Sequence, residues 1–293
     1  MVPQFAIAAA CLLMTNALVS TALAQPLGKE HRYKLGDTEF VGYLARQDRP
    51  GGTRPAALLV HEWWGLNDFA RGQADRLART GTIVLAVDMY GQAKTVTTPE
   101  EARKLATELY TSGQLRPRIL AALEELKKID QVDPNRIVCF GYCMGGNVSL
   151  ELAYSGARIA GVVSLHGSLP LPAETDQILA PILVLHGDAD SLVPPDKVAA
   201  FQQAMRERKA DMTLIVYPNA KHSFTNPQAD ALGMEGVGYN RDADEQSWTH
   251  KRLFFSRCFQ KAMRQNTTTA PAPNAAPQPS RPAAAEPPPP PAD

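Results

Sequence analysis

Short apolar runs typical of buried β-strands alternate with longer segments of helical spacing along most of this chain. The expected strands are His31–Leu35, Phe40–Ala45, Ala56–Val60, Ile83–Val87, Arg136–Phe140, Gly161–Leu165, Pro181–Leu185 and Met212–Tyr217. The expected helices are Asn67–Arg79, Pro99–Tyr110, Leu115–Ile129, Gly145–Tyr154, Asp196–Lys209 and Asp242–Met263. Strands that alternate with helices of this length pair in parallel through right-handed crossovers, with helices on both faces of the sheet. The sequence therefore predicts an α/β fold with a doubly wound, mostly parallel sheet.

The two ends of the chain differ in composition from this central part. Residues 1–24 combine an apolar stretch with Ala22-Leu23-Ala24, the small-x-small pattern that signal peptidase recognises. An uncleaved membrane anchor is the weaker alternative, because the apolar stretch is shorter than the about 20 residues that a spanning helix needs. Residues 266–293, rich in Thr, Ala and Pro, are expected to form a disordered tail. We therefore expect one folded domain over residues 25–265, exported to the periplasm or secreted, without stable membrane insertion.

The charge balance and the cysteine count limit the partners of this domain. Thirty Lys and Arg residues balance thirty Asp and Glu residues, and there is no basic run, so nothing favours nucleic acid. A small, mostly uncharged partner fits better. Cys139, Cys143 and Cys258 lie beyond the signal segment, an odd number for an oxidising compartment. At least one of them must be unpaired or must pair between chains.

One of these cysteines lies in a Gly-x-Cys-x-Gly motif between an expected strand and an expected helix. Gly141 and Gly145 lie two residues on either side of Cys143, which is typical of the tight, strained turn called a nucleophile elbow. Such a turn places Cys143 at a helix N-terminus, where the helix dipole favours a thiolate. The backbone N–H of Met144 would then point at a developing oxyanion. The alternative is a buried core thiol.

Two further motifs supply an acid and a histidine. Asp190 lies in an acidic loop after the strand that ends near Leu185, and His222 lies in a loop after the strand that ends at Tyr217. The order nucleophile, acid, histidine is that of α/β-hydrolases. All three positions follow strand ends, at the edge where open parallel sheets bind ligands. Asp188 is the rival acid, although a turn-forming role suits it better.

Two other histidines in the central part of the chain are interpreted as structural residues. His166 and His186 each end an expected strand, and we expect them to be packing or loop residues.

The segment His61-Glu62-Trp63-Trp64-Gly65-Leu66 follows an expected strand directly. In α/β-hydrolases this loop supplies the second oxyanion N–H, which we assign to Trp63. Glu62 has no evident structural reason to stand there. It is either a surface residue or a group that hydrogen-bonds the Cys143 thiol and modulates its activation.

Together these motifs resemble the dienelactone hydrolases over about residues 30–263. The resemblance rests on Glu62 in HEWWGL, Cys143 in GYCMGG, Asp190 in DADSLVP and His222 in KHSF. It implies an α/β-hydrolase fold and a Cys-His-Asp triad, with Glu62 controlling the thiol. It also implies hydrolysis of small esters or lactones through a thioester acyl-enzyme, without a metal or a cofactor.

Two positions depart from the members that open dienelactones. Gln92 and Asn226 stand roughly where those members carry arginines. A carboxylate-bearing lactone would lose charged hydrogen bonds worth about 1.5–3 kcal/mol each. With Trp63, Trp64 and Tyr90 nearby in the motifs, the sequence predicts a more apolar substrate than dienelactone itself, in a pocket formed by Trp64, Tyr90, Gln92 and Asn226.

Two other functional classes remain open. The chain could be a catalytically silent binding protein with a hydrolase fold, because fold alone does not determine function. It could also be a thiol redox protein that uses Cys139 and Cys143, although their Cys-x3-Cys spacing differs from that of redox motifs. The sequence leaves the oligomeric state and the identity of the substrate open.

Overall fold

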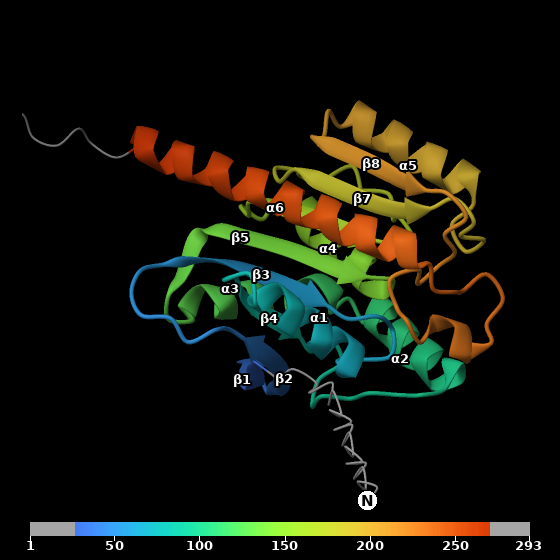
Figure 1. Ribbon diagram of the computed structural model, residues 1–293, viewed down its shortest axis with the longest axis horizontal. Helices are drawn as coiled ribbons and strands as arrows, with labels where there is room; N and C mark the ends of the chain where they lie inside the picture. The colour runs from blue at the N-terminus through green and yellow to red at the C-terminus, as the bar shows by residue number, and fades with distance from the viewer. Residues whose placement is uncertain (1–26, 270–293) are drawn as a thin grey trace, which may run out of the picture.

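The computed structural model describes residues 27–269 (Figure 1). The signal peptide expected over residues 1–24 lies outside this range, as does most of the tail expected over residues 266–293. Within the described range, the chain forms one eight-stranded sheet. Its strands are β1 Gly28–Leu35, β2 Thr38–Ala45, β3 Arg54–Val60, β4 Ile83–Val87, β5 Val132–Tyr142, β6 Gly161–Leu165, β7 Ile182–Gly187 and β8 Met212–Tyr217.

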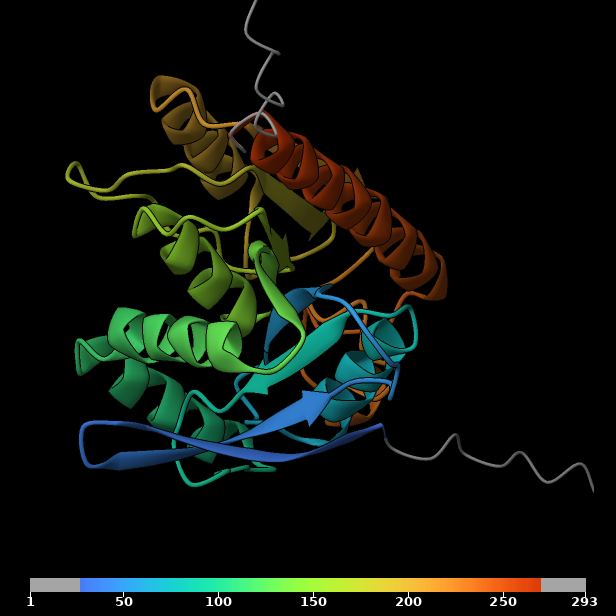
Figure 2. The ribbon, with the colours of Figure 1, turned by 90° about the vertical axis from the view of Figure 1, so that its left-hand side faces the viewer.

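The strand order is β1-β2-β4-β3-β5-β6-β7-β8, and all pairs from β4 to β8 are parallel. Only β1 and β2 run antiparallel to their neighbours, as a hairpin with Gly36 in the left-handed region at its turn. Figure 2 shows this hairpin, in blue, on the side of the molecule away from α5. The predicted mostly parallel sheet is confirmed, with an antiparallel addition at one edge.

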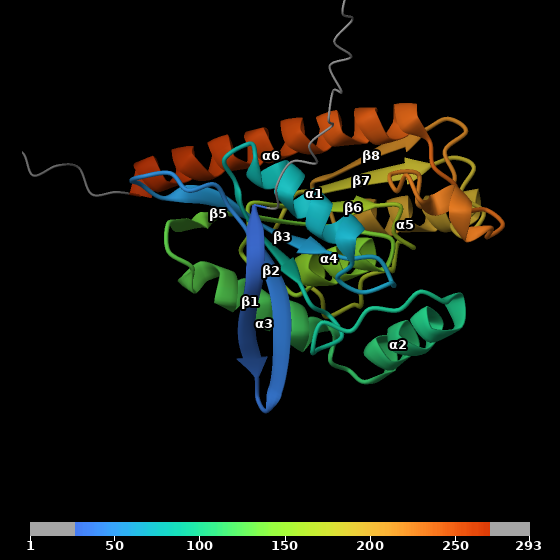
Figure 3. The ribbon, with the colours of Figure 1, turned by 60° about the horizontal axis from the view of Figure 1, so that its bottom comes forward.

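Helices cover both faces of the sheet (Figure 3). The helices are α1 Asp68–Ala78, α2 Pro99–Thr111, α3 Leu115–Lys128, α4 Met144–Tyr154, α5 Pro195–Glu207 and α6 Arg241–Thr269, with a short 3-10 helix at Ala229–Leu232. Helices α1 and α6 pack on one face, and α2, α3, α4 and α5 pack on the other. None of the helices in residues 27–269 has the length and apolar character needed to cross a membrane.

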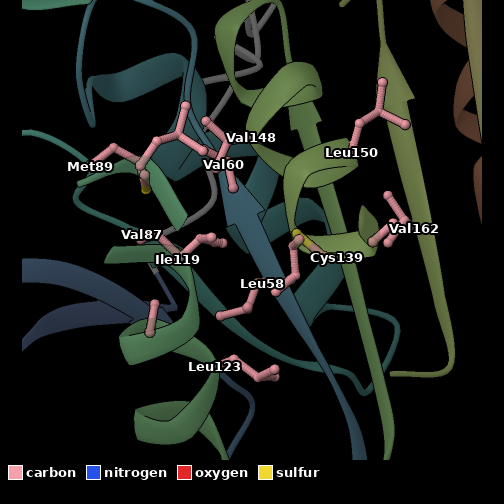
Figure 4. Packing of buried hydrophobic residues seen from close by; sticks show 14 of the residues in the cluster. Leu58, Val60, Val87, Met89, Ile119, Leu123, Cys139, Val148, Leu150 and Val162 are labelled. Atoms are coloured by element: carbon pink, nitrogen blue, oxygen red, sulfur yellow. The ribbon is translucent and has the colours of Figure 1, made fainter. Parts of the chain in front are cut away.

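The central strands are apolar along their whole length because helices cover them from both sides. Every residue of β4 and of β6 is buried. Figure 4 shows one of the two resulting cores, where Leu58 and Val60 of β3 meet Ile119 and Leu123 of α3. Burying a leucine or isoleucine side chain fully contributes about 1.5–3 kcal/mol, so these continuous layers provide the rigid base of the site above them.

Three element boundaries differ from those expected by three residues or more. Strand β5 begins at Val132 because Arg54 pairs with Val132 before a register shift, which adds an irregular first segment that carries no apolar run. Strand β1 begins at Gly28, where the hairpin pairs Gly28 with Ala45. Helix α6 continues to Thr269, past the expected end at Met263, because the residues that follow Met263 include the good helix formers Arg264 and Gln265.

A lysine is buried between α6 and the end of β5. The side chain of Lys251 is fully buried, and its Nζ donates to the Tyr142 hydroxyl at 2.9 Å. The same amine lies 4.4 Å from the centre of the Phe140 ring and 4.7 Å from that of Trp248. Burial, assisted by the charge of Arg76, lowers the pKa of Lys251 well below its ordinary value. Burial therefore favours the uncharged form of this amine, which is held among aromatic rings.

Candidate active site

Cys143 lies in the turn between β5 and α4, with φ 54° and ψ −116°. The two flanking glycines leave no room for a side chain. A Cβ on Gly141 would lie 2.1 Å from the Gly145 carbonyl oxygen, and one on Gly145 would lie 2.2 Å from the Val60 carbonyl oxygen. Backbone atoms cannot move aside cheaply, so the turn requires glycine at both positions. Cys143 is thereby held in a left-handed conformation that a side chain rarely adopts.

The backbone of Cys143 is fastened to the neighbouring strand end. Its N–H donates to the carbonyl oxygen of Leu165 at 3.0 Å and to Nδ1 of His166 at 3.1 Å. Its carbonyl oxygen accepts from Gly146 N at 3.0 Å, within the first turn of α4. Hydrogen bonds to both the N–H and the carbonyl oxygen of Cys143 therefore stabilise the strained turn.

Asp190 and His222 meet across the loops that follow β7 and β8. Nδ1 of His222 lies 2.9 Å from Oδ2 of Asp190, and the other Asp190 oxygen accepts from the backbone N–H of Leu192 at 3.0 Å. Both side chains are buried. Asp188, in contrast, is exposed and accepts from Asn219 N at 2.6 Å, so it ties its loop to the loop after β8.

The imidazole of His222 and Cys143 line the same cavity, and Cys143 acts on the pKa of the ring. Burial is the largest single influence on the pKa of His222 and lowers it. The charge of Cys143 and the hydrogen bond to Asp190 together outweigh burial and raise the pKa well above its ordinary value. The structure thus brings Cys143, His222 and Asp190 into one chain of interactions, in which a proton taken from sulfur can reside on the ring.

Glu62 is buried beside this chain but bonds elsewhere. Its two carboxylate oxygens accept from the Ser223 hydroxyl and from the Asn226 amide, each at 2.9 Å. Burial raises the pKa of Glu62, while these two hydrogen bonds and the charge of His222 oppose the rise. The hydrogen bond expected between Glu62 and Cys143 is absent among the bonds of the described residues. Ser223, in a left-handed turn, occupies one oxygen, and Asn226 occupies the other.

The loop that contains Glu62 is held in place by its neighbours. Nδ1 of His61 lies 2.5 Å from the Glu62 carbonyl oxygen, and Nε2 of His61 accepts from Met89 N at 3.2 Å. The hydroxyl of Tyr90 donates to the Trp63 carbonyl oxygen at 2.8 Å and also lies 3.3 Å from the sulfur of Met144. Tyr90 therefore contacts both residues to which the sequence assigned the oxyanion N–H groups.

A cavity of about 100 Å³ opens at Cys143. Its walls are Trp63, Trp64, Cys143, Leu192, His222, Ser223, Leu232, Met234 and Val237. The two tryptophan rings meet edge to face with their centres 5.0 Å apart. Apart from Cys143, His222 and Ser223, every wall is apolar, so the cavity suits a small uncharged group.

Only one of the four residues expected to form the pocket lines this cavity within the described part of the chain. Trp64 does so. Tyr90 supports the Trp63 loop, Asn226 bonds to Glu62, and Gln92 is exposed. The assignment of these three residues to the substrate pocket stays a prediction.

The sequence analysis missed several residues that line the cavity or contact Cys143. Leu232, Met234 and Val237 come from the segment after His222, which has no helical or strand pattern that would show which side chains point inward. His166 was expected to be a packing or loop residue, and it accepts a hydrogen bond from the Cys143 N–H. A usable signal was its position at the end of the strand next to Cys143, at the same sheet edge as the other site residues.

Comparison with known proteins identifies the family. The model of the dienelactone hydrolase family matches residues 40–259. The solved structure of m3DLH is 36% identical, with a TM-score of 0.76, and the match covers 79% of this chain and 98% of that chain. The dienelactone hydrolase-like promiscuous phosphotriesterase P91, from metagenomic libraries, is 33% identical, with a TM-score of 0.75 and coverage of 79% of this chain and 98% of that chain. The uncharacterized protein K02A2.1 of Caenorhabditis elegans is 39% identical over 152 residues, 50% of this chain and 96% of that protein.

The matched range includes the elbow, the acidic loop and the histidine loop, which are the segments that the structure brings together. The resemblance seen in the sequence motifs and the expected α/β-hydrolase fold are both confirmed. This chain belongs to the dienelactone hydrolase family.

Proposed function

We propose that this protein hydrolyses small, uncharged carboxylic esters or lactones through a cysteine acyl-enzyme. The observation that carries the proposal is the chain of contacts from the Cys143 thiol through His222 to Asp190, at the base of an apolar cavity. A silent binding protein would have no need for a histidine whose pKa is raised by a thiol in a strained turn. We also propose, from residues 1–24, that the protein acts outside the cytoplasm.

The reaction begins with transfer of the Cys143 proton to His222, and the thiolate attacks the carbonyl carbon of the substrate. The N–H groups of Met144 and Trp63 receive the oxyanion. As the tetrahedral intermediate collapses, the carbon–oxygen bond breaks and the leaving alkoxide takes the proton from His222. Water then attacks the thioester, with His222 as its base, and releases the acid and the free thiol. Asp190 holds the ring in the orientation for both transfers.

The cavity supports a short, uncharged acyl group. A volume of about 100 Å³ holds roughly three or four groups of the size of a water or methylene, each of which occupies about 30 Å³. Its walls include no lysine or arginine that could pair with a carboxylate, and a buried Glu62 lies close behind Ser223. We therefore expect acetyl and butyryl esters to be better substrates than octanoyl esters or than esters with a carboxylate on the acyl group.

The test uses p-nitrophenyl acetate, butyrate, octanoate and hemisuccinate with the wild type and with Cys143→Ala. We expect kcat/KM for the butyrate to exceed that for the hemisuccinate by about tenfold or more, the effect of one lost charged hydrogen bond. Intact-mass spectrometry of the wild type after rapid acid quenching should show one added acyl group on Cys143. Turnover by Cys143→Ala at the wild-type rate would end the proposal.

Phosphotriester hydrolysis is a second candidate, supported by the likeness to the phosphotriesterase P91. A triester is uncharged, as the apolar cavity requires. Steady release of nitrophenol from paraoxon, lost in Cys143→Ala, would support it. A single burst equal to the enzyme concentration, followed by loss of esterase activity, would mean that the phosphoryl group only inactivates Cys143.

A further inference from the structure

His166 lies just past the end of β6, with φ 40°, a conformation that side chains other than glycine rarely adopt. Its backbone N–H donates to the Leu185 carbonyl oxygen at 2.9 Å, which ties it to β7. The ring is fully buried and makes one hydrogen bond from each nitrogen. Nδ1 lies 3.1 Å from the backbone nitrogen of Cys143, and Nε2 lies 2.8 Å from the hydroxyl oxygen of Thr225.

These partners determine the tautomer of His166. A backbone N–H can only donate, so Nδ1 must carry a free lone pair to accept from Cys143. The ring proton therefore resides on Nε2 and is donated to Thr225. Burial first, and then the charge of His222, lower the pKa of His166 well below its ordinary value, which keeps the ring neutral. The centres of the two histidine rings are 5.3 Å apart.

Thr225 belongs to the same turn as His222. The N–H of Asn226 donates to the Ser223 carbonyl oxygen at 2.9 Å and closes this turn directly after His222. Ser223 and Asn226 bond to Glu62, at the end of β3, while Thr225 bonds to His166, at the end of β6. Two different strands thus anchor the histidine-bearing turn, and only the His166 anchor also reaches the backbone of the nucleophile.

We propose that His166 is a positioning residue that links the Cys143 elbow to the His222 turn and so sets the geometry between thiol and imidazole. The proposal rests on the proposed cysteine chemistry of this site. His166 is not among the walls of the cavity formed by the described residues, so substrate binding should not depend on it. Its loss should lower kcat and leave KM almost unchanged, because only the alignment of the reacting groups changes.

The experiment breaks the link from either end. His166→Asn keeps an acceptor near the Cys143 N–H but is too short to reach Thr225, and Thr225→Val removes the hydroxyl with little change of shape. We expect each variant to lower kcat for p-nitrophenyl butyrate about tenfold, the upper range for one hydrogen bond, with KM within about twofold. The double variant should lose no more than either single variant, because both remove the same link.

Three matched variants separate this role from general packing. Thr225→Ser restores the hydroxyl and should recover kcat to within about twofold of the wild type. His186→Asn alters the buried histidine next to the last residue of β7, whose Nδ1 has no hydrogen bond, and should leave kcat unchanged. Cys143→Ala tests the reaction itself: full activity in this variant would remove the proposed function, whereas the His166 link would still be measurable by other means.

Two readouts do not need turnover. The rate of Cys143 alkylation by iodoacetamide should fall in His166→Asn and Thr225→Val in parallel with kcat. Nitrogen-15 NMR of labelled histidine should show His166 as the neutral Nε2–H tautomer between about pH 5 and 8. Additive losses in the double variant, alkylation rates equal to the wild type in both single variants, or a His166 ring that carries its proton on Nδ1 would each overturn the proposal.

Discussion

The interior of β5 and the turn that follows it each hold a cysteine, and the two thiols have opposite surroundings. Cys139 is fully buried in the core shown in Figure 4, and its thiol donates to the Ser149 hydroxyl at 3.4 Å. Burial raises the pKa of Cys139 to about 12, despite that hydrogen bond. Cys143 is half-buried at the N-terminus of α4, opens into the cavity and faces His222.

The same side chain thus serves packing in one place and, in the proposed reaction, acts as the nucleophile four residues later; the backbone turn makes the difference. An extended strand directs Cys139 into a layer of apolar side chains, whereas the left-handed residue at the elbow lifts Cys143 above the sheet edge. The described cysteines are all free thiols. Because Cys139 strongly resists ionisation, the contrast argues against the redox interpretation that would pair it with Cys143.

The largest expected effect comes from removing the turn itself. In Gly145→Ala the new Cβ would lie 2.2 Å from the Val60 carbonyl oxygen and 2.7 Å from that of His61, so β3 and α4 must separate. We expect the free energy of unfolding to fall by about 3 kcal/mol or more, measured by urea denaturation. Gly72→Ala, in α1 with open space around it, is the matched control and should gain about 0.5–1 kcal/mol. A Gly145→Ala protein as stable as the wild type would contradict the claim that the turn at Cys143 requires glycine.

A smaller effect is expected from removing the imidazole of His222, which faces Cys143 but not Cys139. The quantity that should change is the pH dependence of Cys143 alkylation. The pKa of His222 is raised, so in the wild type the ring can hold the thiol proton across neutral pH, and Cys143 alkylation should vary little from about pH 6 to 8. In His222→Asn the rate should rise about tenfold per pH unit over that range. Peptide mapping should place the label on Cys143 and not on Cys139. A steep pH dependence in the wild type would contradict the pairing.

The raised pKa of His222 also makes the free energy of unfolding depend on pH, with a loss of stability as the pH rises. Because the pKa of His222 is higher in the folded chain, its contribution to the free energy of unfolding is complete below its ordinary value of 6.5. That contribution is lost as the pH rises through the folded-state value. His222→Asn should therefore flatten the fall in stability on the alkaline side, which urea titrations at several pH values can measure.

The smallest effect is expected from the buried thiol. Cys139→Ala removes one sulfur from the core and one weak hydrogen bond to Ser149, whose hydroxyl still donates to the Gly145 carbonyl oxygen at 2.8 Å. We expect a loss of about 1 kcal/mol in stability and esterase activity within about twofold of the wild type. Slow alkylation of Cys143 in this variant would show that the two thiols are coupled after all.

Much of the fold could be predicted because burial on both faces leaves apolar runs that differ from the amphipathic helices. Strand order could not, since nothing in the local pattern says that β2 pairs with β4 instead of β3. The irregular start of β5 at Val132 was missed for the same reason, because its pairing with Arg54 is a long-range event.

In the site, the positions of Cys143, Asp190 and His222 could be predicted because each follows a strand end and parallel strands bring those ends to one edge. The partners of Glu62 could not. Ser223 and Asn226 reach it only because the chain turns sharply after His222, with Ser223 in the left-handed region. Turns of this kind are determined by tertiary contacts, which single-residue preferences do not encode.

The lowered pKa of Lys251 makes proton uptake part of unfolding. The pKa of Lys251 lies well below 10.5 in the folded chain, so the amine binds a proton more readily in the unfolded chain than in the folded chain. At pH values between the folded-state pKa and 10.5, unfolding is therefore accompanied by proton uptake. Lowering the pH over this range favours the unfolded chain. Helix α6 in this way couples the anchoring of Tyr142, the residue that precedes Cys143, to the pH of the surroundings.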